Sequence, residues 1–402
     1  MRIFCAVRHS LDPRLYWSTL WSANFYPALR QMGHEIVESQ TDLTPGSHFL
    51  HIGGDYTPEQ LRTRGQVTSK LLDELKAAHR ERPIDLMLSY FYNSHFDPAG
   101  FDEIHRMGIK TVNFYCNSMY QFELTSAIAP KVNYAWHAEK PARQRYLDVG
   151  ANPVWVQMAA DPDVYRPVPG LTRAPKSVFL GLRYADRAQW MAALIRADVP
   201  VDIYGPGWGN DPAPEPPATS GSAAGKPVQP PMSKAYAREV QRNFTQHGPI
   251  GGLKRTLVQW KMRNQQREMM PLFKPFAKGA VPFTRIGEIF SSYEVVLNFI
   301  NVWSDGRTGS ELIPHVRLRD FEAPMSRTCF ITGYTDEITE FYEIGTEVDA
   351  YKSEAELVDK TKYYLSHPDA AERLRQAGYE RALRDHTWVR RFEQLFSMIG
   401  MS

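Results

Sequence analysis

The feature that most constrains the fold is an alternation of short apolar segments with helix-like segments, which occurs twice along the chain. Short apolar segments separated by helices indicate βαβ units, in which the strands form a parallel sheet. In the first half the expected strands are RIFCAV (2–7), EIVE (35–38), IDLMLSYF (84–91), KTVNFYCN (110–117), VNYAWHA (132–138) and NPVWVQM (152–158). In the second half they are KSVFLGL (176–182), VDIYG (201–205), EVVLNFI (294–300), TCFITG (328–333) and TEVDAYK (346–352). The sequence therefore predicts an α/β protein with two sheets.

A proline-containing segment separates the two halves. MAADPDVYRPVPG (158–170) carries three prolines and interrupts the alternation. A chain of 402 residues is also longer than one ordinary core supports. We expect two Rossmann-like domains, 1–162 and 163–402, the second ending in a closing helix over 386–399. In such domains ligands bind at the carboxyl ends of the strands, which places a site in the cleft between the domains.

A long insert interrupts the second half over about residues 211–278. Its first part, DPAPEPPATSGSAAGKPVQPPMS, has seven prolines and is typical of a flexible, partly extended linker. The remainder, 234–278, carries ten Lys and Arg against two Glu and places Leu253, Leu257 and Trp260 at helical spacing. Such a basic amphipathic helix either contacts an anionic membrane surface or acceptor, or packs its apolar stripe on its own domain.

Composition and charge indicate a cytoplasmic protein. The net charge of +2 argues against a dedicated nucleic-acid binder. No apolar run approaches the length that spans a bilayer, and MRIFCAVRHS lacks the apolar core of a signal peptide. Cys5, Cys116 and Cys329 fall within or at the end of apolar segments and show no metal-ligand spacing. We expect buried reduced thiols, as in a reducing compartment, with membrane association through the insert as the alternative to a freely dissolved protein.

The segment HVRLRDFEAPM (315–325) carries the most informative charges. We expect a helix over 317–325 that follows a strand of the second domain. The start of such a helix offers free main-chain N–H groups, and Arg317 and Arg319 add guanidinium groups that match phosphate oxygens. Glu322 either accepts hydrogen bonds from vicinal hydroxyls, as on a ribose, or pairs with Arg319 one turn earlier. The residues alone leave both roles open.

RDFEAPMSRTCFITGY and the acidic stretch TDEITEFYEIGTEV after it resemble the C-terminal part of CgeB-like glycosyltransferases of the GT-B type. The shared features are Arg-x-Phe-Glu, a small-residue helix, a strand that ends in Gly, an acidic Phe/Tyr-x-x-Gly-x-Glu and a later His-Thr-Trp. KTVNFYCNSM and VFLGLRYADRAQW are similar to other parts of the same family, and the resemblance covers most of 80–210 and 280–400. It implies two facing Rossmann-like domains and an enzyme that moves a sugar from a nucleotide-sugar, bound mainly by the second domain, to an acceptor hydroxyl.

The resemblance also implies roles in donor binding for residues near the predicted helix. Glu322 matches the second glutamate of the Glu-x7-Glu pattern, which holds the nucleotide ribose in related retaining enzymes. Pro314 stands where the first glutamate of that pattern would be, so the sequence departs from the pattern there. His315, Val316 and Arg317 would lie near the diphosphate and supply main-chain N–H groups and charge.

Residues that follow the other strands of the second domain are further candidates for donor binding. Gly181 ends a predicted strand, where the backbone can approach a ligand closely. Related enzymes place a basic residue here against the diphosphate, and Arg183 or Arg187 would supply it, with a surface role as the alternative for Arg187. Gly205, in YGPGWG, lies in the region that related enzymes use near the base, although turns also favour these residues. Tyr334 follows TCFITG and is expected in the same cleft.

In GT-B enzymes the loop after the first strand faces the acceptor and the donor phosphates, here VRHSLDPRLYWSTLW. His9 and Asp12 can accept a proton from an acceptor hydroxyl and are the expected catalytic residues, with a structural role as the alternative for His9. Trp17 and Trp21, four residues apart, form either an apolar platform for a sugar ring or part of the core. Asn117, a further candidate for contact with the acceptor, lies where CgeB-like relatives often carry an acidic pair, and it cannot act as a base.

No Asp-x-Asp motif lies at a predicted strand end, so we expect metal-independent chemistry without a cofactor. The chain has no Gly-x-Gly-x-x-Gly fingerprint, which argues against NAD-dependent chemistry. Two other functions stay open on the same fold: a noncatalytic nucleotide- or glycan-binding protein, and a nucleotide-sugar epimerase. The expected partners are a nucleotide-sugar and a glycan, lipid-linked or protein acceptor, with no nucleic acid.

Overall fold

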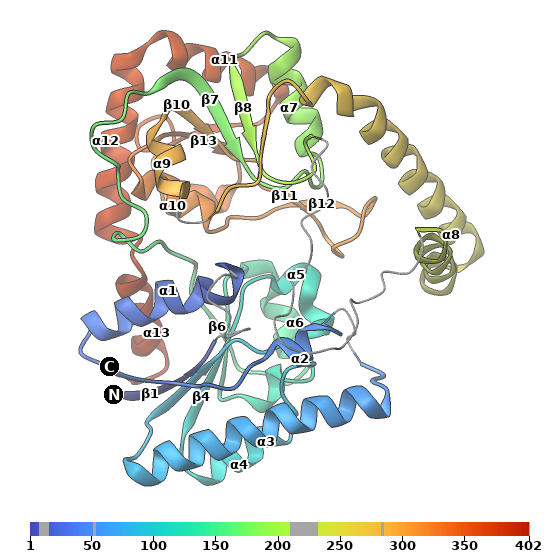
Figure 1. The fold of residues 1–402 in the computed structure, drawn as a ribbon, viewed down its shortest axis with the longest axis vertical. Helices are drawn as coiled ribbons and strands as arrows, with labels where there is room; N and C mark the ends of the chain where they lie inside the picture. Colours follow the sequence, from blue (N-terminus) through green and yellow to red (C-terminus); the bar gives the residue numbers. More distant parts are fainter. Residues whose placement is uncertain (8–15, 51–53, 210–231, 283–284, 402) are drawn as a thin grey trace.

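The computed structural model describes residues 1–7, 16–50, 54–209, 232–282 and 285–401. It contains two six-stranded sheets, which lie one above the other in Figure 1. The first has the order β2-β1-β3-β4-β5-β6 and the second has the order β14-β13-β10-β7-β8-β9. Neighbouring strands of both sheets pair in parallel. The predicted α/β architecture of two Rossmann-like sheets is confirmed.

The strands agree closely with the apolar segments of the sequence. In the first sheet they are β1 (Arg2–Ala6), β2 (Glu35–Glu38), β3 (Leu86–Ser89), β4 (Lys110–Tyr115), β5 (Tyr134–His137) and β6 (Pro153–Trp155). In the second sheet they are β7 (Ala174–Leu180), β8 (Val201–Tyr204), β9 (Ala277–Gly279), β10 (Tyr293–Leu297), β13 (Cys329–Gly333) and β14 (Asp349–Tyr351). The sequence did not predict β9, nor the antiparallel pair β11 (Asn301–Trp303) and β12 (Leu312–Pro314).

Helices cover the sheets and connect their strands. In the first half they are α1 (Tyr16–Gln31), α2 (Thr44–Ser47), α3 (Pro58–Glu81), α4 (Gly100–Arg106), α5 (Ser118–Gln121) and α6 (Arg143–Asp148). In the second half they are α7 (Arg187–Arg196), α8 (Met232–Phe273), α9 (Ile286–Ser291), α10 (Arg319–Met325), α11 (Glu354–Ser366), α12 (Pro368–Asp385) and α13 (Trp388–Met398). Short 3-10 turns occur at Phe122–Leu124, Ala129–Lys131, Lys140–Ala142 and Asp336–Glu340.

The last helix, α13, packs on the first half of the chain. The ring of Trp388 lies 4.8 Å from that of Phe25 in α1, centroid to centroid, and its Nε1 donates to Oδ1 of Asn24 at 3.0 Å. Nearby, Tyr134 at the start of β5 donates to the main-chain oxygen of Ile399 at 3.3 Å. The closing helix therefore returns to the first sheet and brings the two ends of the chain close together (Figure 1).

The insert forms α8, which extends away from both sheets at the right of Figure 1. Leu253, Leu257 and Trp260 are all more than half exposed. The alternative in which this apolar stripe packs on its own domain is therefore wrong. None of the described helices is long and apolar enough to cross a membrane.

Candidate functional site

The candidate site lies where the order of the second sheet reverses. The chain runs from β7 outward to β8 and β9, and then returns to the other side of β7 as β10. Ligands of open α/β sheets bind outside the carboxyl ends of the strands at such a switch point. The segment after β7 leads to Arg187 in α7, and the segment after β12 contains Arg317. These arginines define the site.

Several nitrogen atoms of the Arg187 and Arg317 guanidinium groups have no hydrogen-bond partner among the described residues. Arg187 is buried, and its Nη1 donates to the main-chain oxygen of Leu182 at 2.9 Å. Its Nε, like Nε and Nη2 of Arg317, is buried without a hydrogen-bond partner among the described residues. Burial, and next the charge of Arg317, lower the pKa of Arg187 to about 10. The charge of Asp186 partly offsets the effect of burial on Arg187, and an anion bound between the two guanidinium groups would lower the remaining cost of desolvating them.

The first half of the chain faces Arg317 through Tyr120 of α5. Burial raises the pKa of Tyr120, and the nearby charge of Arg317 opposes that rise. Tyr184, after β7, has a pKa that is likewise raised by burial and lowered in part by Arg317 and Arg187. Arg317 therefore has a tyrosine from each half of the chain in its electrostatic neighbourhood, as expected for a group in the cleft.

Glu322 and Arg319 form a buried pair beside this site. Glu322 is buried in α10, and its Oε2 accepts from Nη1 of Arg319 at 2.9 Å. Its Oε1 accepts from the hydroxyl of Tyr165 at 2.6 Å, and the Arg319 guanidinium lies over the ring of Phe290. The pairing that the sequence offered as an alternative to ribose binding is present, in a buried rather than a surface setting. Arg319 is therefore engaged within the protein, and ribose binding by Glu322 stays a prediction.

Two of the main-chain N–H groups expected near the diphosphate, those of His315 and Arg317, are already bonded. That of His315 donates to the oxygen of Ile300 at 3.2 Å, and that of Arg317 donates to Oδ2 of Asp320 at 2.9 Å. Helix α10 begins at Arg319, two residues later than predicted. The sequence-based role for these N–H groups needs correction, because Asp320 and Ile300 occupy them. The Arg317 side chain supplies the positive charge of this segment that can bind an anion.

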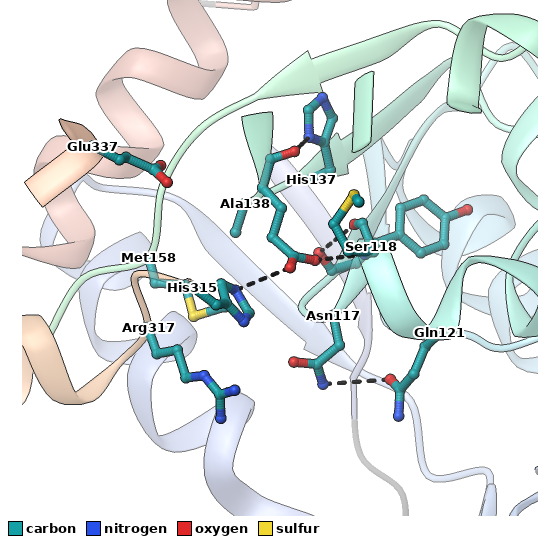
Figure 2. A network of polar contacts seen from close by, with 12 residues as sticks. Asn117, Ser118, Gln121, His137, Ala138, Met158, His315, Arg317 and Glu337 are labelled. Atoms are coloured by element: carbon teal, nitrogen blue, oxygen red, sulfur yellow. Dashed lines mark hydrogen bonds and ion pairs between the residues drawn. The ribbon is translucent and has the colours of Figure 1, made fainter. Parts of the chain in front are cut away.

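His315 instead contacts Glu139 of the first half (Figure 2). Nε2 of His315 lies 3.3 Å from Oε1 of Glu139, and both side chains are 3% exposed. Oε2 of Glu139 accepts from the main-chain N–H of Met119 at 2.8 Å. Burial raises the pKa of Glu139 to about 7, and burial together with Arg317 holds the pKa of His315 well below its usual value. The pair joins the carboxyl end of β5 to the segment that carries Arg317.

Sequence reasoning missed Glu139, although the signal was present. Glu139 stands two residues after the end of β5, and charged residues directly after a buried parallel strand lie at the ligand-binding edge. Two further contacts cross the cleft nearby. Nε2 of Gln157 donates to Oε1 of Glu337 at 2.9 Å, and Nζ of Lys140 pairs with Glu340. Burial also raises the pKa of Glu337 to about 7.

Glycine is required at position 205 by close packing against the backbone of Gly181 at the strand ends. A Cβ on Gly205 would lie 2.4 Å from the main-chain oxygen of Gly181, and Gly205 has a φ of +123°. Arg183 is directed to the insert, where its Nη1 donates to the oxygen of Gln266 in α8 at 3.0 Å. Tyr334 borders a small cavity of about 160 Å³ after β13 and donates to Asp336 at 3.2 Å. Their roles in donor binding stay predictions.

The predicted residues of the first domain have different outcomes. His9 and Asp12 lie outside the described residues, and the side chain of Trp17 in α1 is likewise not described. Trp21 is buried, with its ring 4.7 Å from that of Phe114, so it has no face for a sugar and belongs to the core. Asn117 follows β4, and its Nδ2 donates to Oε1 of Gln121 at 3.4 Å. In Figure 2 the side chains of Asn117 and Arg317 both extend toward the lower part of the view, below His315.

Among the described residues, no group of three or more His, Cys, Asp or Glu side chains is arranged to hold a metal ion. Positive charge at the site comes, among the described residues, from the guanidinium groups of Arg187 and Arg317, with Arg319 nearby.

The chain is similar to known proteins in part of its sequence and in its fold. Residues 229–397 match a family model described as Glycosyl transferase-like. No curated protein shows a significant match to the chain. Among solved structures, the chain is similar to sucrose-phosphate synthase from Thermosynechococcus elongatus, with a TM-score of 0.58, 13% identity and coverage of 99% of this chain and 98% of that one.

Two further structures are similar over the full length. AviGT4, a glycosyltransferase involved in avilamycin A biosynthesis, has a TM-score of 0.54 and 14% identity, with 99% and 96% of the two chains covered. HepE from Anabaena, in complex with UDP, has a TM-score of 0.52 and 10% identity, with 100% of both chains covered. At this identity the likeness shows the fold, which is the GT-B arrangement of two Rossmann-like domains.

Proposed function

We propose that the protein is a glycosyltransferase that moves a sugar from a nucleoside-diphosphate sugar to an acceptor hydroxyl. The observation that carries the proposal is the pair of guanidinium groups of Arg187 and Arg317 at the switch point of the second sheet, both of which have buried nitrogen atoms without hydrogen-bond partners among the described residues. Two features support it: the glycosyltransferase-like sequence of residues 229–397 and the likeness to HepE, whose structures include complexes with UDP and with UDP-glucose. The CgeB-like motifs favour that group of glycosyltransferases.

In this proposal Arg187 and Arg317 bind the diphosphate of the donor. Guanidinium groups match phosphate oxygens in geometry, and charge-assisted hydrogen bonds are roughly twice as strong as neutral ones. When the sugar leaves, negative charge grows on the diphosphate, and fixed cations in a buried cleft stabilise that charge. The two arginines thereby take the part that a divalent metal plays in other transferases, so transfer is metal-independent.

The other donor contacts follow from their positions. Glu322 accepts hydrogen bonds from the ribose hydroxyls through the acceptor capacity left beside Tyr165 and Arg319. Gly181 and Gly205 keep the strand ends free of side chains, so that the nucleotide approaches the backbone. Glu139 acts as a positioning residue, because its contact with His315 fixes the segment that carries Arg317. His9 and Asp12 keep their predicted role in proton transfer, with the acceptor held by the first domain.

The experiment that tests the proposal is release of nucleoside diphosphate from a panel of nucleotide-sugars. We expect one donor to yield nucleoside diphosphate slowly through hydrolysis, faster when an acceptor is supplied, and without stimulation by added Mg²⁺ or loss with EDTA. Arg317→Gln and Arg187→Gln should each lower the rate by tenfold or more, about 1.4 kcal/mol or more of transition-state stabilisation. Stabilisation by nucleotides without any release would favour the noncatalytic binding protein, and an altered sugar formed without acceptor would favour the epimerase.

A further inference from the structure

One face of α8 is apolar and open to solvent. The helix is interrupted at Gly248, whose φ of 69° and ψ of −179° are not helical, and its second segment runs on to Phe273. On this segment Ile250 is 86% exposed, Leu253 53%, Leu257 56% and Trp260 57%. Their spacing of three, four and three residues places them along one side of the helix, and we call these four residues the apolar stripe.

The outward direction of the apolar stripe is fixed by contacts on the opposite face. Nδ2 of Asn243, in the first segment of α8, donates to Oγ1 of Thr256 at 3.1 Å and to Oε1 of Gln259 at 2.9 Å. Nε2 of Gln259 in turn donates to the main-chain oxygen of Thr308 at 3.1 Å. Arg255 pairs with Asp305 at 2.9 Å. Because these bonds hold the polar face against the protein, the helix cannot rotate the apolar stripe inward without breaking them.

Positive charges accompany the apolar stripe. Lys254 and Lys261 are exposed and lie one turn after Ile250 and Leu257, so they border the same side of the helix. Arg267 is exposed further along the segment. Residues 232–273 contain eight Lys and Arg and two Glu. An apolar strip that contains tryptophan and is bordered by lysines is complementary to a bilayer surface that carries negative headgroups.

We propose that the apolar stripe is a docking surface for an anionic lipid membrane. Ile250, Leu253, Leu257 and Trp260 enter the boundary between headgroups and acyl chains to a depth of about 5–10 Å, while Lys254 and Lys261 contact the negative headgroups. Each basic residue near such a surface contributes about 1 kcal/mol, so the surface charge decides which membranes are bound. The proposal goes beyond the proposed function, since it concerns α8 and not the donor site, and it holds whatever reaction the cleft performs.

The test is co-sedimentation of the full chain with vesicles of phosphatidylcholine alone or mixed with phosphatidylglycerol. We expect binding to the mixed vesicles only, with an affinity that falls as salt is raised. The double variant Leu253→Ser/Leu257→Ser should bind at least about tenfold more weakly, because it removes two inserted side chains. Lys254→Gln/Lys261→Gln should also weaken binding and reduce its dependence on salt.

A matched control uses exposed leucines outside α8. Leu61 and Leu147 are each 43% exposed and belong to α3 and α6. The variant Leu61→Ser/Leu147→Ser should bind vesicles like the wild type. All these side chains are exposed, so far-ultraviolet circular dichroism and melting temperature should be unchanged in every variant, which separates loss of binding from loss of folding.

Depth of insertion gives a second readout. Phosphatidylcholine with brominated acyl chains quenches tryptophan that reaches the bilayer, and we expect quenching that disappears in Trp260→Phe. Failure to bind mixed vesicles, equal binding to neutral vesicles, or quenching that persists in Trp260→Phe would overturn the proposal. Self-association in sedimentation velocity that the two serine substitutions in α8 abolish, without any vesicle binding, would assign the apolar stripe to a second copy of the chain instead.

Discussion

Nε2 of His315 and Oε1 of Glu139 lie 3.3 Å apart at a contact between the two halves of the chain. Glu139 follows a strand of the first sheet, and His315 precedes by two residues the arginine that we place on the donor diphosphate. Closure of the cleft and the position of the guanidinium group are therefore linked through one contact. The contact is buried, so its protonation affects the stability of the whole protein.

Replacement of Glu139 by Gln should change how stability depends on pH. Burial raises the pKa of Glu139 from 4.5 to about 7 in the folded protein. The folded protein binds this proton more tightly than the unfolded chain does. The resulting contribution to the unfolding free energy is fully present below pH 4.5 and is lost as pH rises through 7. The Glu139→Gln variant does not undergo this loss. The difference in unfolding free energy between the variant and wild type should therefore shift in favour of the variant by on the order of 3 kcal/mol between acidic and mildly alkaline pH.

Urea unfolding at several pH values checks this prediction. Glu340→Gln is the control, because Glu340 is 46% exposed in its pair with Lys140 and should show a nearly constant difference from wild type. A Glu139→Gln difference that is equally flat would mean that the carboxyl group is not protonated in the folded protein at neutral pH.

Arg317→Gln should leave the unliganded protein as stable as wild type, or more stable by about 1 kcal/mol. The reason is that Nε and Nη2 of Arg317 have no hydrogen-bond partner among the described residues, so the substitution removes a partly buried charge without breaking a bond of these atoms. Arg319→Gln should destabilise by about 2 kcal/mol or more, because it removes a donor from buried Glu322. Thermal melts of both variants test this prediction. Equal destabilisation of Arg317→Gln and Arg319→Gln would show that Arg317 has a structural role.

Glu322 and Tyr165 allow a test of ribose recognition. We expect wild type to prefer a nucleoside diphosphate over its 2′-deoxy form by about tenfold, the effect of one hydrogen bond to a charged group. Glu322→Gln should reduce that preference. Tyr165→Phe should cost about 1 kcal/mol of stability, since its hydroxyl donates to Glu322 at 2.6 Å, and should keep the preference. Calorimetric titration with both nucleotides measures this preference. A preference that is unaffected in Glu322→Gln would place ribose recognition elsewhere.

Gly205→Ala should be among the most harmful single substitutions in the second sheet. The added Cβ would meet the oxygen of Gly181 at 2.4 Å, and the φ of +123° is also unfavourable for alanine. Gly33→Ala is the matched control, because Gly33 has a φ of +80° and no atom within 4 Å of the added Cβ. We expect about 1 kcal/mol of destabilisation for Gly33→Ala, and clearly more for Gly205→Ala. Similar melting temperatures for the two variants would contradict the close packing of β7 and β8.

Much of the fold could be predicted from the sequence because short apolar segments alternate regularly with helix-like segments. EIVE (35–38) coincides with β2, and TCFITG (328–333) differs from β13 by one residue. The hairpin of β11 and β12 escaped prediction because its three-residue strands are too short for a period to appear. The exposed stripe of α8 could not be predicted either, since a helical pattern shows that apolar residues share a face but not what covers it.

The candidate site was predicted only in part. Arg317 could be proposed from its place near the start of a predicted helix, and Arg187 from the family resemblance of the segment after a predicted strand. The sequence could not show that Asp320 would take the main-chain N–H of Arg317, because this depends on a buried carboxylate that also accepts from Asn298 and Thr332. Nor could it show the contact of Glu139 with His315, which forms only when the two halves of the chain come together.

Calorimetric titration with a nucleoside diphosphate, the monophosphate and the nucleoside measures whether Arg317 and Arg187 bind the diphosphate of the donor. We expect wild type to bind the diphosphate at least about tenfold more tightly than the nucleoside, and we expect this difference to shrink strongly in Arg317→Gln and Arg187→Gln. Equal affinity for diphosphate and nucleoside in wild type, or a difference that both variants retain, would show that these arginines do not bind the diphosphate.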